Sequence, residues 1–306
     1  MRFAEVVPEA LAGERVDRVV AMLTGCSRSE AAALVAAGEV RVDGRAVTTR
    51  STKLAVGALV EVEAPDPDAP PELAPEPDVP VPVVHEDEHL LIVDKPAGLV
   101  VHPGAGQHTG TLVHGLLARY PEIAGVGVDP IRPGIVHRLD KGTSGLLLVA
   151  RTQEAYHELV AALAAREVHR RYRTLVWDHV AAPSGLIDAP IGRSQREPTR
   201  MAIVEHGKEA RTRYDVLATY DEPVAVTELA CTLETGRTHQ IRVHLRSIGH
   251  PVVGDNRYDG ARQSLPFDRP FLHAELLELD HPVTGEPVRA ESPLPEDLRA
   301  LLARLR

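Results

Sequence analysis

An acidic, proline-rich segment is the feature that most limits how this chain can fold. Between Glu61 and Asp94 the sequence has eleven acidic residues and no lysine or arginine, and eight prolines stand in the same stretch. Proline fixes φ and removes a backbone donor, and like charges repel, so the segment is typical of an extended linker. The pattern predicts a small domain over residues 1–62, a linker over 63–82 and a larger domain over 83–306.

The same segment changes the meaning of the net charge. The 306 residues carry 34 basic and 44 acidic side chains, a formal net charge of −10, which by itself argues against a nucleic-acid partner. Without the eleven acids of the segment, 33 acidic side chains remain against 34 basic ones, a net charge of +1. The objection to a polyanionic partner therefore rests on the linker and not on the parts expected to fold.

The remaining composition is that of an ordinary globular protein, with 43% hydrophobic and 25% charged residues. The first residues lack the apolar region of a secretory signal, and no run of 18 apolar residues predicts a membrane span. The two cysteines, Cys26 and Cys231, are too few for a disulfide framework and lack metal-ligand spacing. We expect a cytoplasmic protein. Because the chain has no glycine-rich phosphate loop, we expect no nucleotide cofactor.

The N-terminal region has the pattern of two helices, a hairpin and a strand. Ser27, with Glu30 three positions later, resembles a capping box at the start of the second helix, and Gly38 is typical of its C-cap. The expected elements are a helix over 16–23, a helix over 28–37, a hairpin around Asp43-Gly44 and a strand over 57–64.

The larger region mixes short strands with helices. Its apolar runs and alternating stretches predict strands over 89–96, 145–151, 169–177, 210–220 and 224–235, and a helix over 153–166. No repeat of solenoid period is present.

A glycine-rich turn holds the first candidate for chemistry. In the block from Gly134 to Leu146, Arg138, Asp140 and Lys141 stand directly before an apolar strand. A carboxylate at such a strand end can face a cleft. The alternative is a turn in which Asp140 only caps backbone N–H groups.

A second block, residues 166–173, is dense in cations. Arg170, Tyr172 and Thr174 share one face of the expected strand, whereas Arg171 and Arg173 share the other. Cations beside an aromatic ring suit a nucleic-acid site, where charge meets phosphate and the ring stacks on a base. The alternative is an exposed basic strand with a half-buried tyrosine.

A third block, residues 234–250, concentrates arginines and histidines and has no acid between Glu234 and Asp255. Residues 241–248 have helical spacing, with an apolar stripe of Ile241, Leu245 and Ile248. The cations are Arg237, Arg242 and Arg246, and the histidines are His239, His244 and His250. A metal site is a weak alternative, because the histidines lack the i, i+4 pair of a zinc helix. A solvated basic helix is the other alternative.

Together the motifs resemble those of the RluA-type pseudouridine synthases. The resemblance rests on HRLDKGTSGLLLVA, DEHLLIVDKPAGLVVHPG, RRYRTLVWD and TGRTHQIRVHLRSIGHPVVGD, which stand in the family's order from about Val83 to Pro295. Residues 14–47 resemble an S4 RNA-binding domain. The resemblance implies an α+β fold, with a helix-helix-hairpin S4 domain and a catalytic domain on a mixed, largely antiparallel sheet.

The resemblance also implies an activity and the roles of four residues. The activity is isomerisation of uridine in RNA, in which the bond from ribose C1′ to uracil N1 is replaced by one from C1′ to C5. Asp140 matches the catalytic aspartate and Tyr172 the tyrosine that stacks on the target base. Arg242 matches the counter-ion of the aspartate, and Arg138 matches the arginine that supports the flipped nucleotide. Asp140 can act as a nucleophile at C1′ or as the base that gives a glycal.

We therefore expect an isomerase that requires no metal and no cofactor, acts on large-subunit ribosomal RNA, and is monomeric and not bound to a membrane. The alternatives are a tRNA target, a non-catalytic RNA-binding ribosome assembly factor, and a metal-dependent hydrolase. The S4-like unit would bind RNA through its second helix and its hairpin. The RNA-binding residues we expect are Arg28, Arg41, Arg45, Arg138, Arg170, Arg171, Arg237 and His239.

Overall fold

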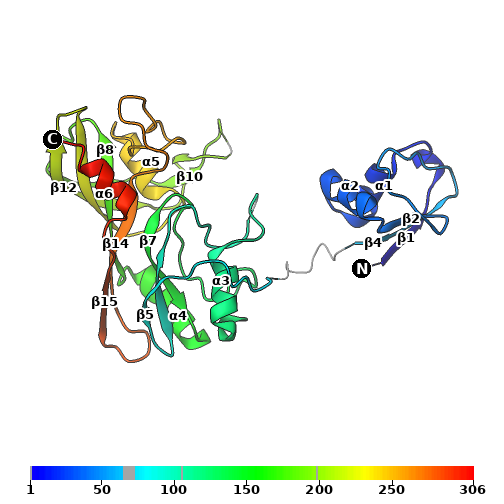
Figure 1. The fold of residues 1–306 in the computed structure, drawn as a ribbon, viewed down its shortest axis with the longest axis horizontal. Helices are drawn as coiled ribbons and strands as arrows, with labels where there is room; N and C mark the ends of the chain where they lie inside the picture. Colours follow the sequence, from blue (N-terminus) through cyan, green and yellow to red (C-terminus); the bar gives the residue numbers. More distant parts are fainter. Residues whose placement is uncertain (1, 65–72, 105, 198) are drawn as a thin grey trace. The chain divides into compact units, whose positions relative to one another are not determined.

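The computed structural model describes residues 2–64, 73–104, 106–197 and 199–306. The chain divides into two compact units, Met1–Pro71 and Glu72–Arg306, which we call the N-terminal unit and the C-terminal unit (Figure 1). Within the described residues no single helix is long and apolar enough to cross a membrane. One pair of helices, bent by 113°, meets the length and composition criteria jointly.

The N-terminal unit packs two helices on a four-stranded sheet of order β1-β4-β2-β3. Its elements are β1 (Arg2–Val6), a 3-10 turn (Glu9–Leu11), α1 (Val16–Thr24), α2 (Arg28–Ala37), β2 (Val40–Val42), β3 (Arg45–Ala46) and β4 (Leu59–Glu63). The expected helices, hairpin and strand are present, and the capping box of Ser27 and Glu30 begins α2. Strand β1 was not predicted from the sequence, because it is an edge strand with no buried residue and so lacks a clear apolar alternation.

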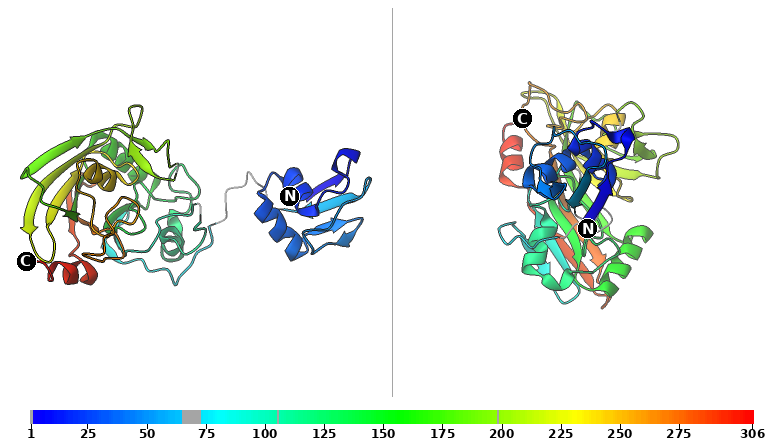
Figure 2. Two further views of the ribbon diagram at one scale, coloured as in Figure 1. Left: turned by 90° about the horizontal axis from the view of Figure 1, so that it is seen from above. Right: turned by 90° about the vertical axis from the view of Figure 1, so that its right-hand side faces the viewer.

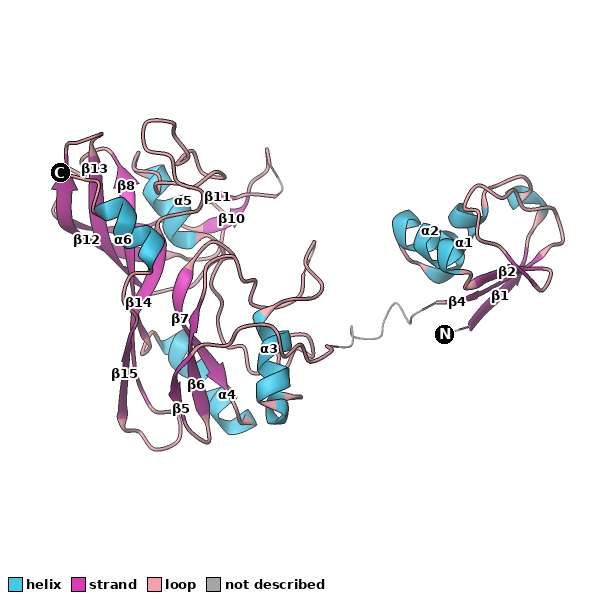
Figure 3. Ribbon diagram, in the orientation of Figure 1, coloured by secondary structure: helices cyan, strands magenta, loops and turns pink. Residues whose placement is uncertain are grey.

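The C-terminal unit is built on a nine-stranded sheet, coloured by element type in Figure 3. Its path is β5-β6-β7-β14-β8-β13-β12-β9, with β15 paired to β14, and only the β7–β14 pair is parallel. The strands are β5 (Val83–Glu86), β6 (Leu90–Lys95), β7 (Ser144–Ala150), β8 (His169–Trp177), β9 (Ser184–Asp188), β12 (Arg211–Tyr220), β13 (Val226–Leu233), β14 (Leu272–Asp280) and β15 (Pro287–Glu291). A separate hairpin joins β10 (Ile191–Arg193) to β11 (Met201–Ile203). The mixed, largely antiparallel sheet agrees with the expected fold class.

Alternate residues of the central strands build two apolar layers. On β6, Leu91 and Val93 pack with α3 (Leu112–Arg119), whereas Leu90 and Ile92 pack with α4 (Gln153–Ala165). One helix therefore covers each face of this part of the sheet, as the period-two alternation of strand side chains requires. The remaining helical elements are a 3-10 turn (Pro121–Ile123), α5 (Gln240–Ser247) and α6 (Glu296–Leu302). Helix α6 lies at the periphery of the unit in both views of Figure 2.

The second half of the expected linker is docked and not free. Residues 65–72 lie outside the described residues, but 73–82 pack against α3. The Glu76 carboxylate accepts the Gly110 N–H at 3.0 Å, and the Glu76 N–H donates to the His114 carbonyl at 3.0 Å. A Cβ on Gly115 would lie 2.7 Å from the Val79 carbonyl oxygen, so this close approach needs glycine. The proline and acid content favoured a linker over this whole stretch. Composition cannot show that residues 73–82 make such contacts with α3.

A second close approach positions the turn that contains Asp140. Gly145, at the start of β7, has φ +108°, and a Cβ there would lie 2.2 Å from the Ala274 carbonyl oxygen of β14. Ala274 in turn pairs with Tyr172 of β8. Gly145 therefore lets β7, which follows the Asp140 turn, pack closely on β14, the strand that separates it from β8 and Tyr172.

Candidate active site

Asp140 is held by a buried arginine. Nη1 of Arg242, from α5, donates to Asp140 Oδ2 at 2.9 Å. The Nε and Nη2 atoms of Arg242 donate to the two carboxylate oxygens of Asp255 at 2.6 and 2.8 Å. Burial opposes the Arg242 charge, but the hydrogen bonds and charges of Asp255 and Asp140 outweigh it and raise the pKa of Arg242. Arg242 is thus a fixed cation that serves two carboxylates.

Tyr258 and His239 complete this side of the site. The Arg242 guanidinium lies over the Tyr258 ring, 5.0 Å from its centroid. His239, at the N-cap of α5 with φ 59°, places Nδ1 2.7 Å from the Tyr258 hydroxyl and Nε2 3.9 Å from Asp140 Oδ1. Burial lowers the pKa of His239. The imidazole is therefore neutral near pH 7 and adds no second full charge beside Asp140.

Tyr172 faces the same site from β8. Its side chain is buried, and burial raises the pKa of the phenol although Arg170 acts in the opposite direction. The ring is therefore a neutral, largely buried surface beside the carboxylate. Arg170, Tyr172 and Thr174 share one face of β8, as predicted. That face is buried, so the alternative of an exposed basic strand with a half-buried tyrosine is wrong.

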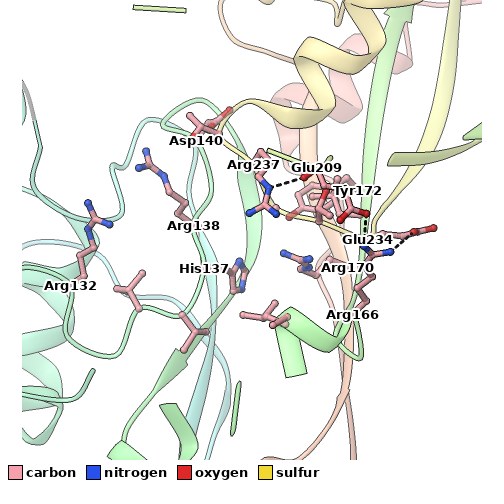
Figure 4. A pocket seen from close by; sticks show the side chains of 18 of the residues that line it. Arg132, His137, Arg138, Asp140, Arg166, Arg170, Tyr172, Glu209, Glu234 and Arg237 are labelled. Carbon is pink, nitrogen blue, oxygen red and sulfur yellow. Dashed lines mark hydrogen bonds and ion pairs between the residues drawn. The ribbon is translucent and has the colours of Figure 1, made fainter. Parts of the chain in front are cut away.

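A cavity of about 540 Å³ opens between these elements (Figure 4). Its lining includes Asp140, Tyr172, Arg138 and Arg170. Five arginines and three acids contribute to its wall. The other arginines are Arg132, Arg166 and Arg237, and the other acids are Glu209 and Glu234. The cavity is larger than a single base, and its wall carries more positive than negative side chains. Both properties suit one nucleotide of a nucleic acid.

Arg138 is another residue of the cavity wall. Its Nη1 donates toward His102 Nε2 at 3.4 Å, and His102 Nδ1 donates to the Pro103 carbonyl at 2.8 Å. No carboxylate of the described residues forms an ion pair with Arg138. Its charge is therefore available to a ligand in the cavity.

Other expected RNA-binding residues lie elsewhere. Arg171 is on the opposite face of β8, where its Nε donates to Glu275 at 2.7 Å, so we do not include it in the proposed site. Arg237 lines the cavity and donates to the Glu209 carbonyl at 2.9 Å. The three expected RNA-binding residues of the N-terminal unit are exposed on α2, β2 and β3; they are Arg28, Arg41 and Arg45.

Helix α5 differs from both alternatives weighed for its basic block. Its residues from Gln240 to Leu245 are buried, so it is not a solvated basic helix, and Ile248 of the expected apolar stripe is 39% exposed. The histidines of the block contact separate partners, since His244 bonds Thr212 and His250 bonds the Trp177 carbonyl. No group of three potential metal ligands lies among the described residues.

Two residues of the site were not predicted from the sequence. Asp255 was quoted only as the end of a motif, yet it is the first acid after a run of cations and is fully buried against one of them. Lys95, the last residue of β6, is also fully buried, and its Nζ donates to the Pro96 and Leu99 carbonyls at 2.9 Å. Burial lowers the pKa of Lys95 to about 7. An isolated acid or lysine carries no periodic signal that would reveal such burial.

Comparison with known proteins identifies the family of this chain. The family model described as RNA pseudouridylate synthase matches residues 89–247, and the S4 domain model matches residues 14–60. The chain belongs to the RNA pseudouridylate synthase family. Members of this family are isomerases that convert uridine of RNA to pseudouridine, so the resemblance noted from the motifs is confirmed, together with the S4 domain.

Similar proteins cover nearly the whole chain. A protein of Xanthomonas campestris pv. campestris named ribosomal large subunit pseudouridine synthase D is 45% identical, over 98% of this chain and 92% of its own. A Pseudomonas aeruginosa protein of the same name is 46% identical, over 99% and 95%. Among solved structures, human RNA pseudouridylate synthase domain containing 1 is 29% identical, with a TM-score of 0.59 over 76% of this chain and 90% of that chain.

Proposed function

We propose that this pseudouridine synthase modifies uridines of large-subunit ribosomal RNA, with Asp140 as its catalytic residue. The observation that carries the catalytic assignment is the Asp140 carboxylate, 2.9 Å from the buried Arg242 guanidinium at the wall of a nucleotide-sized cavity. The RNA target rests on the S4 domain and on the names of relatives that are 45% and 46% identical over nearly the full chain.

Asp140 supplies the carboxylate that the reaction needs. In one route it attacks ribose C1′, which breaks the bond to uracil N1 and leaves the ribose esterified to the aspartate. In the other it removes the C2′ proton, so that uracil leaves as its anion and the ribose becomes a glycal. In both routes the base then turns. In the first route C5 bonds to C1′ and displaces the Asp140 carboxylate, and in the second C5 bonds to C1′ while Asp140 returns the proton to C2′. The C5 proton is then lost and N1 gains a proton, so the product is an isomer of uridine. Arg242 orients the carboxylate for the first step and places a positive charge beside it.

The aromatic and basic residues hold the flipped nucleotide. The target uridine must leave the helical stack to reach Asp140. Tyr172 offers the ring on which uracil stacks, and stacking of this kind contributes about 1–3 kcal/mol per base. Arg138, without a carboxylate partner among the described residues, supports the nucleotide in the cavity, and Arg237 and His239 line its path.

The S4 domain adds affinity through a tether. Two linked modules that each bind modestly bind together more tightly, because the second contact becomes intramolecular. We propose residues 1–62 as the RNA-binding domain and 83–306 as the catalytic domain. Arg28 of α2 and Arg41 and Arg45 of the hairpin are the proposed contacts of the S4 domain. We further propose that the protein acts as a monomer, without a membrane.

The target is tested by mapping. Pseudouridines are detected by carbodiimide in total RNA from cells with and without the gene. The proposal expects the loss of one or more sites in large-subunit ribosomal RNA, and their return when the wild-type gene is restored. Loss only in transfer RNA contradicts the ribosomal target. Loss of ribosomal sites that a gene encoding Asp140→Asn restores contradicts the catalytic assignment and favours a non-catalytic assembly factor.

A further inference from the structure

Arg170 carries a charge that the protein leaves unpaired. Its side chain projects from β8, is 6% exposed, and has a buried Nε without a hydrogen-bond partner. Among the described residues no carboxylate forms an ion pair with it. Burial lowers the pKa of Arg170, as expected for a cation without a counter-ion. A buried unpaired charge destabilises a fold, so its presence calls for a reason outside the fold.

The acids nearest this wall are bound to other arginines. Glu209 accepts from Arg166 at 2.6 Å. Glu234 lies 3.1 Å from Arg211 and 2.7 Å from Arg213. Asp140, the third acid of the wall, is paired with Arg242 at 2.9 Å, so each acid that lines the cavity is bound to an arginine other than Arg170.

His137 contributes a second donor without an acceptor. Its Nε2 accepts the Leu148 N–H at 2.9 Å, so the proton of the neutral ring is on Nδ1. Burial and the charge of Arg170 lower the pKa of His137 to about 3, so the ring is neutral near pH 7. Nδ1 is buried and has no hydrogen-bond partner. An N–H in this state has lost water and gained nothing in exchange.

Both side chains line the same cavity as Asp140 and Tyr172. Figure 4 shows the Arg170 guanidinium pointing toward His137, on the opposite side of the cavity from Arg132. Arg170 is two residues before Tyr172 on one face of β8, so their side chains leave the strand about 7 Å apart. That spacing lies within the reach of a single nucleotide whose base is stacked on Tyr172.

The two groups restrict the chemistry of what can bind there. Neither a guanidinium nor an Nδ1–H can accept a hydrogen bond, so the ligand atom must be an acceptor. The positive charge of Arg170 favours an anionic acceptor over a neutral one, because only an anion offsets the buried charge. The substrate offers one anionic group per nucleotide, its phosphodiester.

We propose that Arg170 and His137 form a phosphate subsite that binds the RNA backbone beside the target uridine. This inference rests on the proposed function, since it takes RNA as the ligand of the cavity. The subsite would position the nucleotide relative to Asp140, while Arg242 is bound to the carboxylates of Asp140 and Asp255. The two buried arginines of the site thus have separate tasks.

The test measures kcat/KM for pseudouridine formation at subsaturating RNA. The probe is total RNA from cells without the gene, and KCl is varied between about 50 and about 200 mM. Arg170→Gln is expected to lower kcat/KM about tenfold at the lower salt, and to reduce the slope of its logarithm against log[KCl] by about 0.7, as for one lost phosphate contact in single-stranded RNA. Arg170→Lys keeps the charge and is expected to keep the wild-type slope.

Two further variants sharpen the comparison. Arg171→Gln, the adjacent arginine on the opposite face of β8, is the matched control and is expected to keep the wild-type kcat/KM and slope. His137→Gln retains an acceptor for the Leu148 N–H but loses the unpaired Nδ1 donor. Because His137 is neutral, this variant is expected to lower kcat/KM and leave the salt slope unchanged.

Thermal unfolding separates a ligand-binding role from a structural one. A group that binds only ligand can be removed without cost to the free protein, so Arg170→Gln is expected to keep or raise Tm. A lower Tm with wild-type kcat/KM would overturn the proposal. A lower kcat/KM with an unchanged salt slope would also overturn it, because it would assign Arg170 to a neutral acceptor such as a uracil carbonyl.

The outcome does not depend on which RNA is the target. If wild-type protein forms pseudouridine only in RNA other than ribosomal RNA, the proposed target fails and the comparison of Arg170 variants remains valid. If Arg170→Gln behaves as the wild type while ribosomal sites are modified, the subsite fails and the proposed function stands.

Discussion

The buried ion pair between Arg242 and Asp255 allows a prediction about stability, and a neighbouring surface ion pair supplies the control variant. Asp255 is fully buried, and its Oδ2 accepts the Arg242 Nε–H at 2.6 Å. Its Oδ1 accepts from Arg242 Nη2 and from the backbone of Arg257 and Tyr258. In Asp255→Asn the amide oxygen can keep the Oδ1 contacts, which leaves the amide NH₂ facing the Arg242 Nε–H.

The expected cost follows from those contacts. Breaking a buried ion pair by removal of one partner costs about 3–5 kcal/mol. Asp140 remains beside Arg242 and compensates part of the lost charge, so we expect the free energy of unfolding to fall by about 3 kcal/mol. We also expect kcat to fall, because Arg242 loses the anchor that directs it at Asp140.

The chain supplies a matched control on the same helix. Arg246, one turn after Arg242 in α5, pairs with Asp259 at 2.6 Å, and these side chains are 47% and 59% exposed. Asp259→Asn makes the same chemical change four residues after Asp255. Exposed pairs contribute about 0–1 kcal/mol, so this variant is expected to unfold as the wild type does.

Trp177 makes the assay specific to the catalytic part. It is the single tryptophan of the chain and is buried in β8 of the C-terminal unit. Urea unfolding followed by its fluorescence therefore reports on that unit without a contribution from the S4 domain. A loss of less than about 1 kcal/mol in Asp255→Asn, or equal losses in the two variants, would refute the reasoning.

Three further predictions concern other parts of the molecule. Tyr172→Leu removes the stacking ring and is expected to weaken RNA binding by about 1–3 kcal/mol, whereas Tyr172→Phe keeps KM near wild type; steady-state kinetics of the two variants provide the check. Because the folded pKa of Lys95, about 7, lies below its unfolded value of 10.5, the unfolded chain binds more protons between these values, and stability rises with pH across that window. The loss of this rise in Lys95→Met, measured by urea unfolding from pH 7 to 10, tests it. Gly115→Ala places a methyl group against the Val79 carbonyl and is expected to cost about 1–3 kcal/mol and to expose residues 73–82 to protease, read by limited proteolysis.

Local sequence signals predicted much of the fold. The capping box at Ser27 and the Asp-Gly hairpin rest on interactions within a few residues, and β8 shows in its sequence the alternation of a strand with one buried face. Strand β1 lacked such a pattern, because it has no buried residue and so no apolar alternation. The docking of 73–82 on α3 depends on distant contacts that composition does not report.

The site was predictable only in part for the same reason. Motif resemblance identified Asp140, Tyr172 and Arg242, and the geometry brings Asp140 and Arg242 to 2.9 Å. It did not reveal that Arg242 serves Asp255 as well, nor that Arg170 is buried without a partner. Which charged residues form ion pairs depends on which of them are adjacent in the folded structure. Neither the periodicity of apolar residues nor the net charge reveals this.

The central claim is that the Asp140 carboxylate performs the isomerisation, and loss of the C5 proton measures it directly. RNA labelled with tritium at uridine C5 releases the label when C5 bonds to C1′. The account predicts that wild-type protein releases tritium from total RNA of cells without the gene, and that Asp140→Asn binds the same RNA but releases none. Release by Asp140→Asn at the wild-type rate would contradict it.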